Sequence, residues 1–167
     1  MSYEINILVV GQDSPVELPF QTSICIKNEY DNERTVGRYF EICPFFMQTK
    51  GTLYSLGRMY PGNFFSALSI CDSDFSKPII LSASTSWIAD EARECLTPFI
   101  VFREQIDELE KILSFLLDSS PQKQIMFHTR YQGGDTEIIC GVIDKMRFFE
   151  RLERQELYFN VCYIVTG

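Results

Sequence analysis

The chain has 167 residues, of which 46% are hydrophobic and 23% charged, and its formal net charge is −8. A globule of this size buries roughly 70% of the surface that its unfolded form exposes, so we expect a single domain over residues 1–167 with one sizeable core. The fourteen Phe and eight Tyr argue against disorder, and the negative charge disfavours nonspecific binding to nucleic acid or an anionic membrane, which depends on Lys and Arg.

The N-terminal half is predicted to be rich in strands. Residues 3–10 contain many β-branched side chains and end at a cluster of turn-forming residues, 11–15. No basic leader precedes them, and the apolar run at 7–10 is too short for a signal sequence or a membrane span, so we expect a soluble, cytoplasmic protein. Strand-like patterns follow at 22–27, 37–46, 52–59 and 78–86.

The clearest amphipathic helix is predicted over residues 103–118. Helical spacing places an apolar stripe on one face, with Ile112 at its margin: Ile106, Leu109, Leu113, Leu116 and Leu117. The opposite face carries Glu104, Glu108, Lys111 and Phe115. Residues 87–95 fit another short helix, and the apolar run 99–102 either ends a strand or begins the long helix.

The C-terminal part is predicted to contain a hairpin and a central strand. Two alternating runs within residues 124–143 flank Gly133-Gly134, a pair that suits a tight turn, and this register sets Arg130 opposite Glu137. Residues 157–165 are apolar on both faces, as is typical of a strand covered on both sides. Together the elements predict an α+β fold, in which a mostly antiparallel sheet is packed on one face by the long helix.

The negative charge is concentrated in one segment. Between residues 90 and 110, seven acids stand against two arginines, Arg93 and Arg103, a local net charge of −5. We predict that this segment binds a basic partner, with Phe115 as an aromatic anchor on the acidic side of the helix. A solvated helix face is the alternative interpretation. The predicted partner-binding residues are Asp90, Glu91, Glu94, Glu104, Asp107, Glu108, Glu110 and Phe115.

The sequence lacks the motifs of metal and cofactor chemistry. His128 is the only histidine and no C-x-x-C pair occurs, so neither a multi-histidine metal site nor a bound cofactor is expected. An enzyme that pairs a cysteine with His128 is the alternative from the catalytic class, although a structural or surface histidine is the favoured interpretation. The cysteines are scattered in apolar surroundings, as is typical of reduced core residues: Cys25, Cys43, Cys71, Cys95, Cys140 and Cys162.

Small size, acidity, an expected cytoplasmic location and the absence of a catalytic motif describe the chain as a whole. In these respects it resembles the immunity proteins that neutralise bacterial polymorphic toxins. The resemblance implies a non-catalytic inhibitor that occludes the active or substrate-binding surface of a basic, nuclease-like toxin, with carboxylates in place of substrate phosphates. It rests on no diagnostic motif, so it assigns no individual residue. A small-molecule-sensing domain with an aromatic pocket is a third interpretation.

Overall fold

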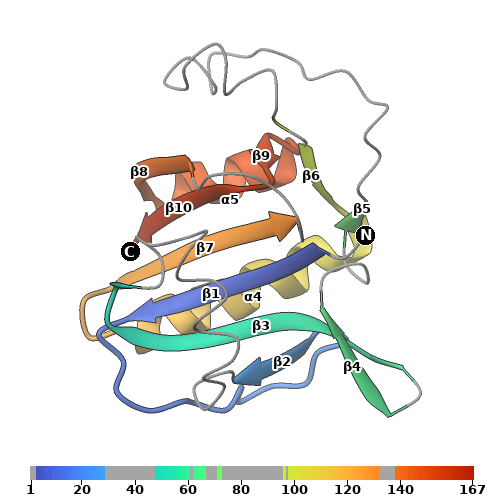
Figure 1. The fold of residues 1–167 in the computed structure, drawn as a ribbon, viewed down its shortest axis with the longest axis horizontal. Helices are drawn as coiled ribbons and strands as arrows, with labels where there is room; N and C mark the ends of the chain where they lie inside the picture. The colour runs from blue at the N-terminus through green and yellow to red at the C-terminus, as the bar shows by residue number, and fades with distance from the viewer. Residues whose placement is uncertain are drawn as a thin grey trace.

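A mixed sheet forms the centre of the molecule (Figure 1). The computed structural model describes residues 3–28, 48–60, 62–66, 71–72, 96, 98–131 and 138–167, and seven strands of the sheet lie within them. Six follow in the order β2 (Cys25–Asn28), β3 (Gly51–Tyr60), β1 (Tyr3–Val10), β7 (Gln124–Tyr131), β10 (Val161–Thr166) and β8 (Ile138–Asp144). The seventh, β4 (Asn63–Ser66), pairs with β3. Every pair is antiparallel except β8 with β10.

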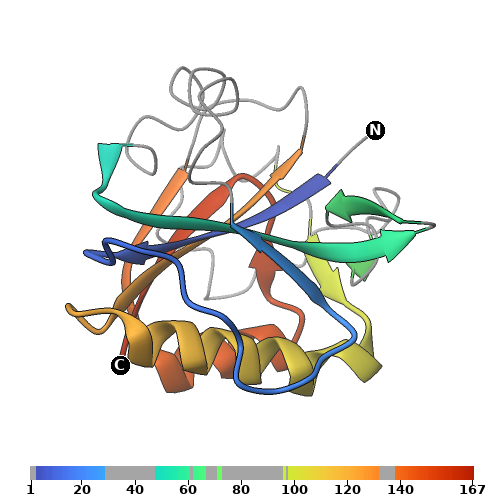
Figure 2. The same ribbon diagram turned by 90° about the horizontal axis from the view of Figure 1, so that it is seen from below.

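Two helices in the described part of the chain cover one face of this sheet (Figure 2). The first, α4 (Arg103–Ser119), confirms the predicted helix, and its buried residues are Leu109, Ile112, Leu113, Leu116 and Leu117. The second, α5 (Lys145–Glu153), begins after Asp144, whose Oδ1 atom accepts a hydrogen bond from the backbone N–H of Arg147 at 3.0 Å. The predicted α+β fold with a mostly antiparallel sheet is therefore confirmed, and α5 is a second helix beside the predicted one.

Aromatic side chains fix α5 against the strands. Phe148 of α5 meets Phe127 of β7 and Tyr163 of β10, with ring centroids 5.3 Å and 5.7 Å apart. Phe127 in turn meets Phe99 at 5.9 Å. Phe99 belongs to β6 (Pro98–Val101), which joins β5 (Cys71–Asp72) and β9 (Leu157–Tyr158) in a smaller sheet. The apolar run that begins at Phe99 is thus a strand, and the helix starts only at Arg103.

The predicted hairpin over 124–143 is wrong. Strand β10 lies between β7 and β8, so these two strands are not neighbours. The physical reason is that β10 is buried along both faces at residues 161–163, and a central position covers such a strand. This position confirms a central strand from Val161 onward, but the single strand predicted over 157–165 is wrong in extent, because a turn at Asn160 separates β10 from β9, which belongs to the smaller sheet. Gly133-Gly134 and Glu137 lie outside the described residues.

The other predicted elements have mixed outcomes. The strands at 3–10 and 52–59 are confirmed as β1 and β3, whereas the strand predicted at 22–27 begins only at Cys25. The elements predicted at 37–46, 78–86 and 87–95 lie outside the described residues. No helix in the described ranges is long and apolar enough to cross a membrane.

Candidate functional site

An extended segment, residues 12–24, connects β1 to β2 and passes along α4 (Figure 2). We call this segment the strap. It meets Ser119 first, then Phe115, then Glu108, so it runs antiparallel to the helix. Alternate residues of the strap are partly or fully buried, namely Val16, Leu18, Phe20, Thr22 and Ile24. The face of α4 that the sequence predicted to be open is therefore partly covered.

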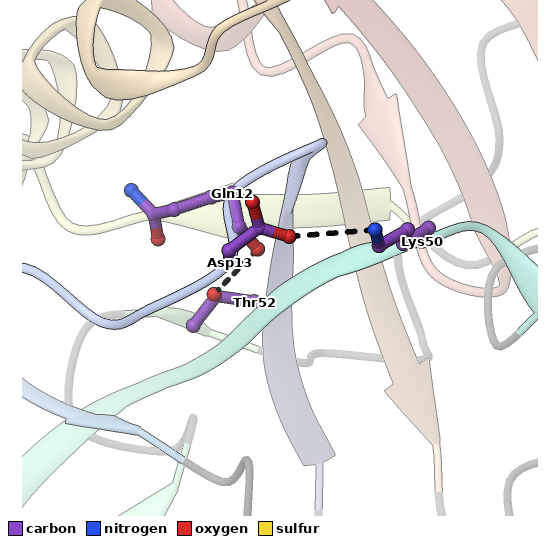
Figure 3. A network of polar contacts seen from close by, with 4 residues as sticks. All are labelled: Gln12, Asp13, Lys50 and Thr52. Atoms are coloured by element: carbon purple, nitrogen blue, oxygen red, sulfur yellow. Dashed lines mark hydrogen bonds and ion pairs between the residues drawn. The ribbon is translucent and has the colours of Figure 1, made fainter.

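The strap begins in a network of polar contacts at the end of β1. The carbonyl oxygen of Gln12 accepts a hydrogen bond from Thr52 Oγ1 at 3.0 Å, and Asp13 forms an exposed ion pair with Lys50 at 3.4 Å (Figure 3). The side chain of Gln12 is buried, and its Nε2 atom donates to Ser119 Oγ at 3.0 Å. The network therefore joins the strap to β3 and to the C-terminal end of α4.

Glu108 holds the other end of the strap. Its Oε2 atom accepts hydrogen bonds from Thr22 Oγ1 at 2.5 Å, Ser23 N at 2.7 Å, Ser23 Oγ at 2.9 Å and Ile24 N at 3.3 Å. These bonds, that of Thr22 above all, hold the pKa of Glu108 below its ordinary value against the opposing effect of desolvation. Glu108 thus binds a segment of its own chain and is not the free acid that the sequence predicted.

Phe115 is also in contact with the strap. Its ring meets that of Phe20 edge-on, with centroids 6.0 Å apart. Lys111 Nζ lies 4.3 Å from the centre of the same Phe20 ring. Phe115 is half-buried and packs against the core as well. In the free protein it is therefore not presented as the open aromatic anchor that the sequence predicted.

Glu110 has a different environment, beside α5. Burial raises the pKa of Glu110 above its ordinary value, and repulsion by Glu153 of α5 and by Asp107 raises it further, whereas Lys145 lowers it. Its Oε1 atom is buried and lacks a hydrogen-bond partner among the described residues. Carboxylates from two helices thus meet in one region, and the attraction of Lys145 does not offset the burial and repulsion there.

The remaining predicted acids are open or outside the described ranges. Glu104 and Asp107 are exposed near the start of α4, and neither forms a hydrogen bond or ion pair within the described chain. Asp90, Glu91 and Glu94 lie outside the described residues. We call Glu104, Asp107, Glu110 and Glu153 the acidic surface.

The sequence alone does not identify Glu153 as a neighbour of Glu110, nor Thr22 and Ser23 as partners of Glu108. Glu153 joins the acidic surface only because α5 packs beside α4, and no local pattern indicates that contact. Thr22 and Ser23 were assigned to a strand, yet their hydroxyls bind Glu108. Adjacent hydroxyl residues that follow a proline-containing turn region were the only local signal for such a role.

A row of polar side chains also crosses the sheet on the face opposite the helices. Ser55, Asn6, His128 and Cys162 are successive partners in the register of β3, β1, β7 and β10. Ser55 Oγ donates a hydrogen bond to Asn6 Oδ1 at 2.8 Å. Cys162 is 0% exposed and His128 is 1% exposed. The fold therefore pairs the single histidine with a cysteine, but encloses both side chains.

Metal-binding groups and similarity to known proteins are two other sources of evidence on function. In the ranges that the structure describes, no group of three or more His, Cys, Asp or Glu side chains is arranged to hold a metal ion. Comparison of the chain with protein-family models, curated proteins and solved structures finds no match. Its function is therefore inferred from its own residues.

Proposed function

We propose that this protein acts in the cytoplasm, without a cofactor, by binding a basic protein through the acidic surface. The partner is a toxin of the nuclease-like class, and the protein acts as its immunity inhibitor by occluding the active or substrate-binding surface. Carboxylates are suited to this role because a nuclease surface binds phosphates with Lys and Arg.

The observation that supports this proposal is the environment of Glu110. The fold brings its carboxylate beside Asp107 and Glu153 and leaves Oε1 without a partner in the described chain. This arrangement lowers the stability of the free protein when Glu110 is ionised, because repulsion and desolvation both oppose the charge of its carboxylate. A cationic group from a partner would offset both effects by forming an ion pair with the carboxylate. The unpaired, exposed carboxylates of Glu104 and Asp107 extend the same negative region.

Charge and apolar contact would act at different stages of binding. Exposed acids steer a basic partner during diffusional encounter and so raise the association rate. An exposed aromatic side chain contributes to retention once it is desolvated. Phe102, at the N-cap position of α4, is 37% exposed and stands two residues from Glu104. Because Phe115 is in contact with the strap, Phe102 is an aromatic side chain that a partner can contact in the free protein.

The test reverses charge without disturbing the strap. Glu104→Lys with Asp107→Lys changes the charge of exposed positions only, whereas Glu108 must stay because it binds the strap. The control, Asp118→Lys with Glu150→Lys, makes the same change of charge at exposed positions outside the strap and the acidic surface. The protein is coexpressed with the product of the adjacent upstream gene, copurification and rescue of growth are scored, and association rates are measured at several salt concentrations.

We expect the Glu104 and Asp107 reversals to slow association about tenfold at low salt, and more than the control does. The difference should shrink as salt is added, because screening weakens steering between exposed charges. If both double variants associate with the partner at equal rates that do not depend on salt, the proposal is wrong.

A second candidate function is a cysteine-dependent hydrolase or transferase. The specific observation in its favour is the cross-strand pairing of Cys162 with His128 and of His128 with Asn6. The enclosure of all three side chains, at no more than 1% exposure, opposes it because a substrate must reach the thiol. Thiol profiling of the native protein decides between the two: a single hyper-reactive cysteine, lost in Cys162→Ser, would favour the enzyme.

A further inference from the structure

The strap lies along α4 without a backbone ladder. Between residues 13 and 23, no backbone-to-backbone hydrogen bond joins it to the described part of the chain. Its amide groups are held instead by side chains: Tyr54 OH accepts from Val16 N at 2.9 Å, and Glu108 accepts from Ser23 N at 2.7 Å. A segment with few backbone hydrogen bonds opens locally at a lower free energy than the strands beside it.

The strap packs as an extended peptide, with Val16, Leu18 and Phe20 partly buried against the core and Ile24 inside it. Inward and outward side chains alternate from residue 16 to 24, as in any extended chain. Phe20 contacts both Phe115 and Lys111, and the hydroxyl of Thr22, two positions later, binds Glu108. This face of α4 therefore accommodates one aromatic side chain followed at strand spacing by hydrogen-bond donors.

We propose that the strap is a displaceable cover of a binding face on α4, and that the basic partner lays an extended segment there in its place. This inference rests on the proposed function. In the complex, an apolar side chain of the partner contacts Phe115, and a cationic or hydroxyl donor binds Glu108. Displacement of the strap frees the carboxylate of Glu108, which then joins Glu104 and Asp107 in one continuous negative region.

The first experiment measures opening of the strap in the protein alone. Thr22→Val with Ser23→Ala removes the two hydroxyl donors to Glu108 and keeps its charge, and Gln21→Ala is the control at an exposed neighbour. Backbone hydrogen exchange at Val16, whose N–H donates to Tyr54 and to neither substituted residue, should accelerate at least about tenfold in the double variant and not in the control, while Phe127 in β7 stays unchanged. The cover is overturned if Val16 exchanges at the rate of Phe127 in every variant, because the strap would then open only with global unfolding.

The second experiment measures occupancy of the face. The probe is a labelled synthetic peptide of residues 17–24 that carries Glu17→Lys and Gln21→Lys, two exposed positions of the strap. It should bind the Thr22→Val, Ser23→Ala protein at least about tenfold more tightly than the wild type, because the apparent affinity rises with the fraction of open molecules. A peptide with the further change Phe20→Ala should lose this binding. If the peptide binds the wild type and the double variant with equal affinity, or does not bind the double variant, the strap is not a displaceable cover.

The two proposals fail in different ways. Peptide binding at Glu108 without any basic protein that associates through Glu104 and Asp107 would support the cover and remove the immunity role. Salt-sensitive association through Glu104 and Asp107 without peptide binding at Glu108 would overturn the cover and leave the proposed function intact.

Discussion

Glu108 and Glu110 stand two positions apart on α4, and their carboxylates have opposite environments. Two helical positions differ by about 200°, so one side chain faces the strap while the other lies beside α5. Thr22, Ser23 and Ile24 donate to Glu108 and lower its pKa, whereas burial and two neighbouring acids raise the pKa of Glu110.

The comparison teaches that an acidic segment is not one functional unit. In the free protein Glu108 is bound to the strap, because one of its oxygens accepts four hydrogen bonds from strap residues. The environment of Glu110 lowers the stability of the folded protein. A residue that lowers stability without an evident structural reason is a candidate for function. Four substitutions test this difference, from the largest expected effect to the smallest.

A cavity in the core beneath α4 should disturb the environments of Glu108 and Glu110 together. Leu116 is completely buried, so Leu116→Ala should lower the free energy of unfolding by about 3 kcal/mol, measured by chemical denaturation. Asp118→Ala, an exposed position on the same helix, should change it by less than about 0.5 kcal/mol. A loss of similar size in both variants would contradict the packing of α4 described above.

The start of the strap should depend on Tyr54. Its hydroxyl donates to Gln12 Oε1 at 2.5 Å and accepts from Val16 N at 2.9 Å, so Tyr54→Phe leaves two groups without this partner. We expect a loss of about 2 kcal/mol in the free energy of unfolding. An unchanged transition midpoint would show that water replaces the hydroxyl and that the anchor of the strap is weak.

Glu108→Gln should destabilise the protein by about 1 kcal/mol at neutral pH, because the amide oxygen accepts the same hydrogen bonds without the negative charge that strengthens them. The folded-state pKa of Glu108 is lowered, so its stabilisation is present above the ordinary pKa and disappears as pH falls through the lowered value. Unfolding curves of wild type and variant should therefore converge in acid. Glu104→Gln, at an exposed and unpaired position, should change the free energy of unfolding by less than about 0.5 kcal/mol at neutral pH.

Glu110→Gln should have the smallest effect and the opposite sign. Removal of a desolvated, repelled charge should stabilise the protein by about 0.5 kcal/mol at neutral pH. Because the folded-state pKa of Glu110 is raised, this advantage should shrink as pH falls through the raised value and the wild-type carboxyl takes up a proton. Destabilisation by Glu110→Gln would show that its carboxylate is needed by the fold and would weaken its assignment to partner binding.

Periodic patterns predicted the parts of the fold that depend on local burial. The helix of α4, the strands β1 and β3 and the central position of β10 follow from apolar spacing. The hairpin over 124–143 failed because a turn-forming pair between two alternating runs does not exclude a later strand from inserting between them. Strand order depends on which strands most need cover on both faces, a property of the whole sheet.

The sequence by itself determined the α+β class, the amphipathic helix and the concentration of acids along it, because composition and periodicity are local properties of the chain. Only the tertiary structure decided what each acid does. Strap residues distant in sequence supply the donors to Glu108, and α5 brings Glu153 toward Glu110. Hydrogen bonding, desolvation and charge repulsion act between groups that the fold brings together, so two acids of one helix differ in ways that their spacing alone does not show.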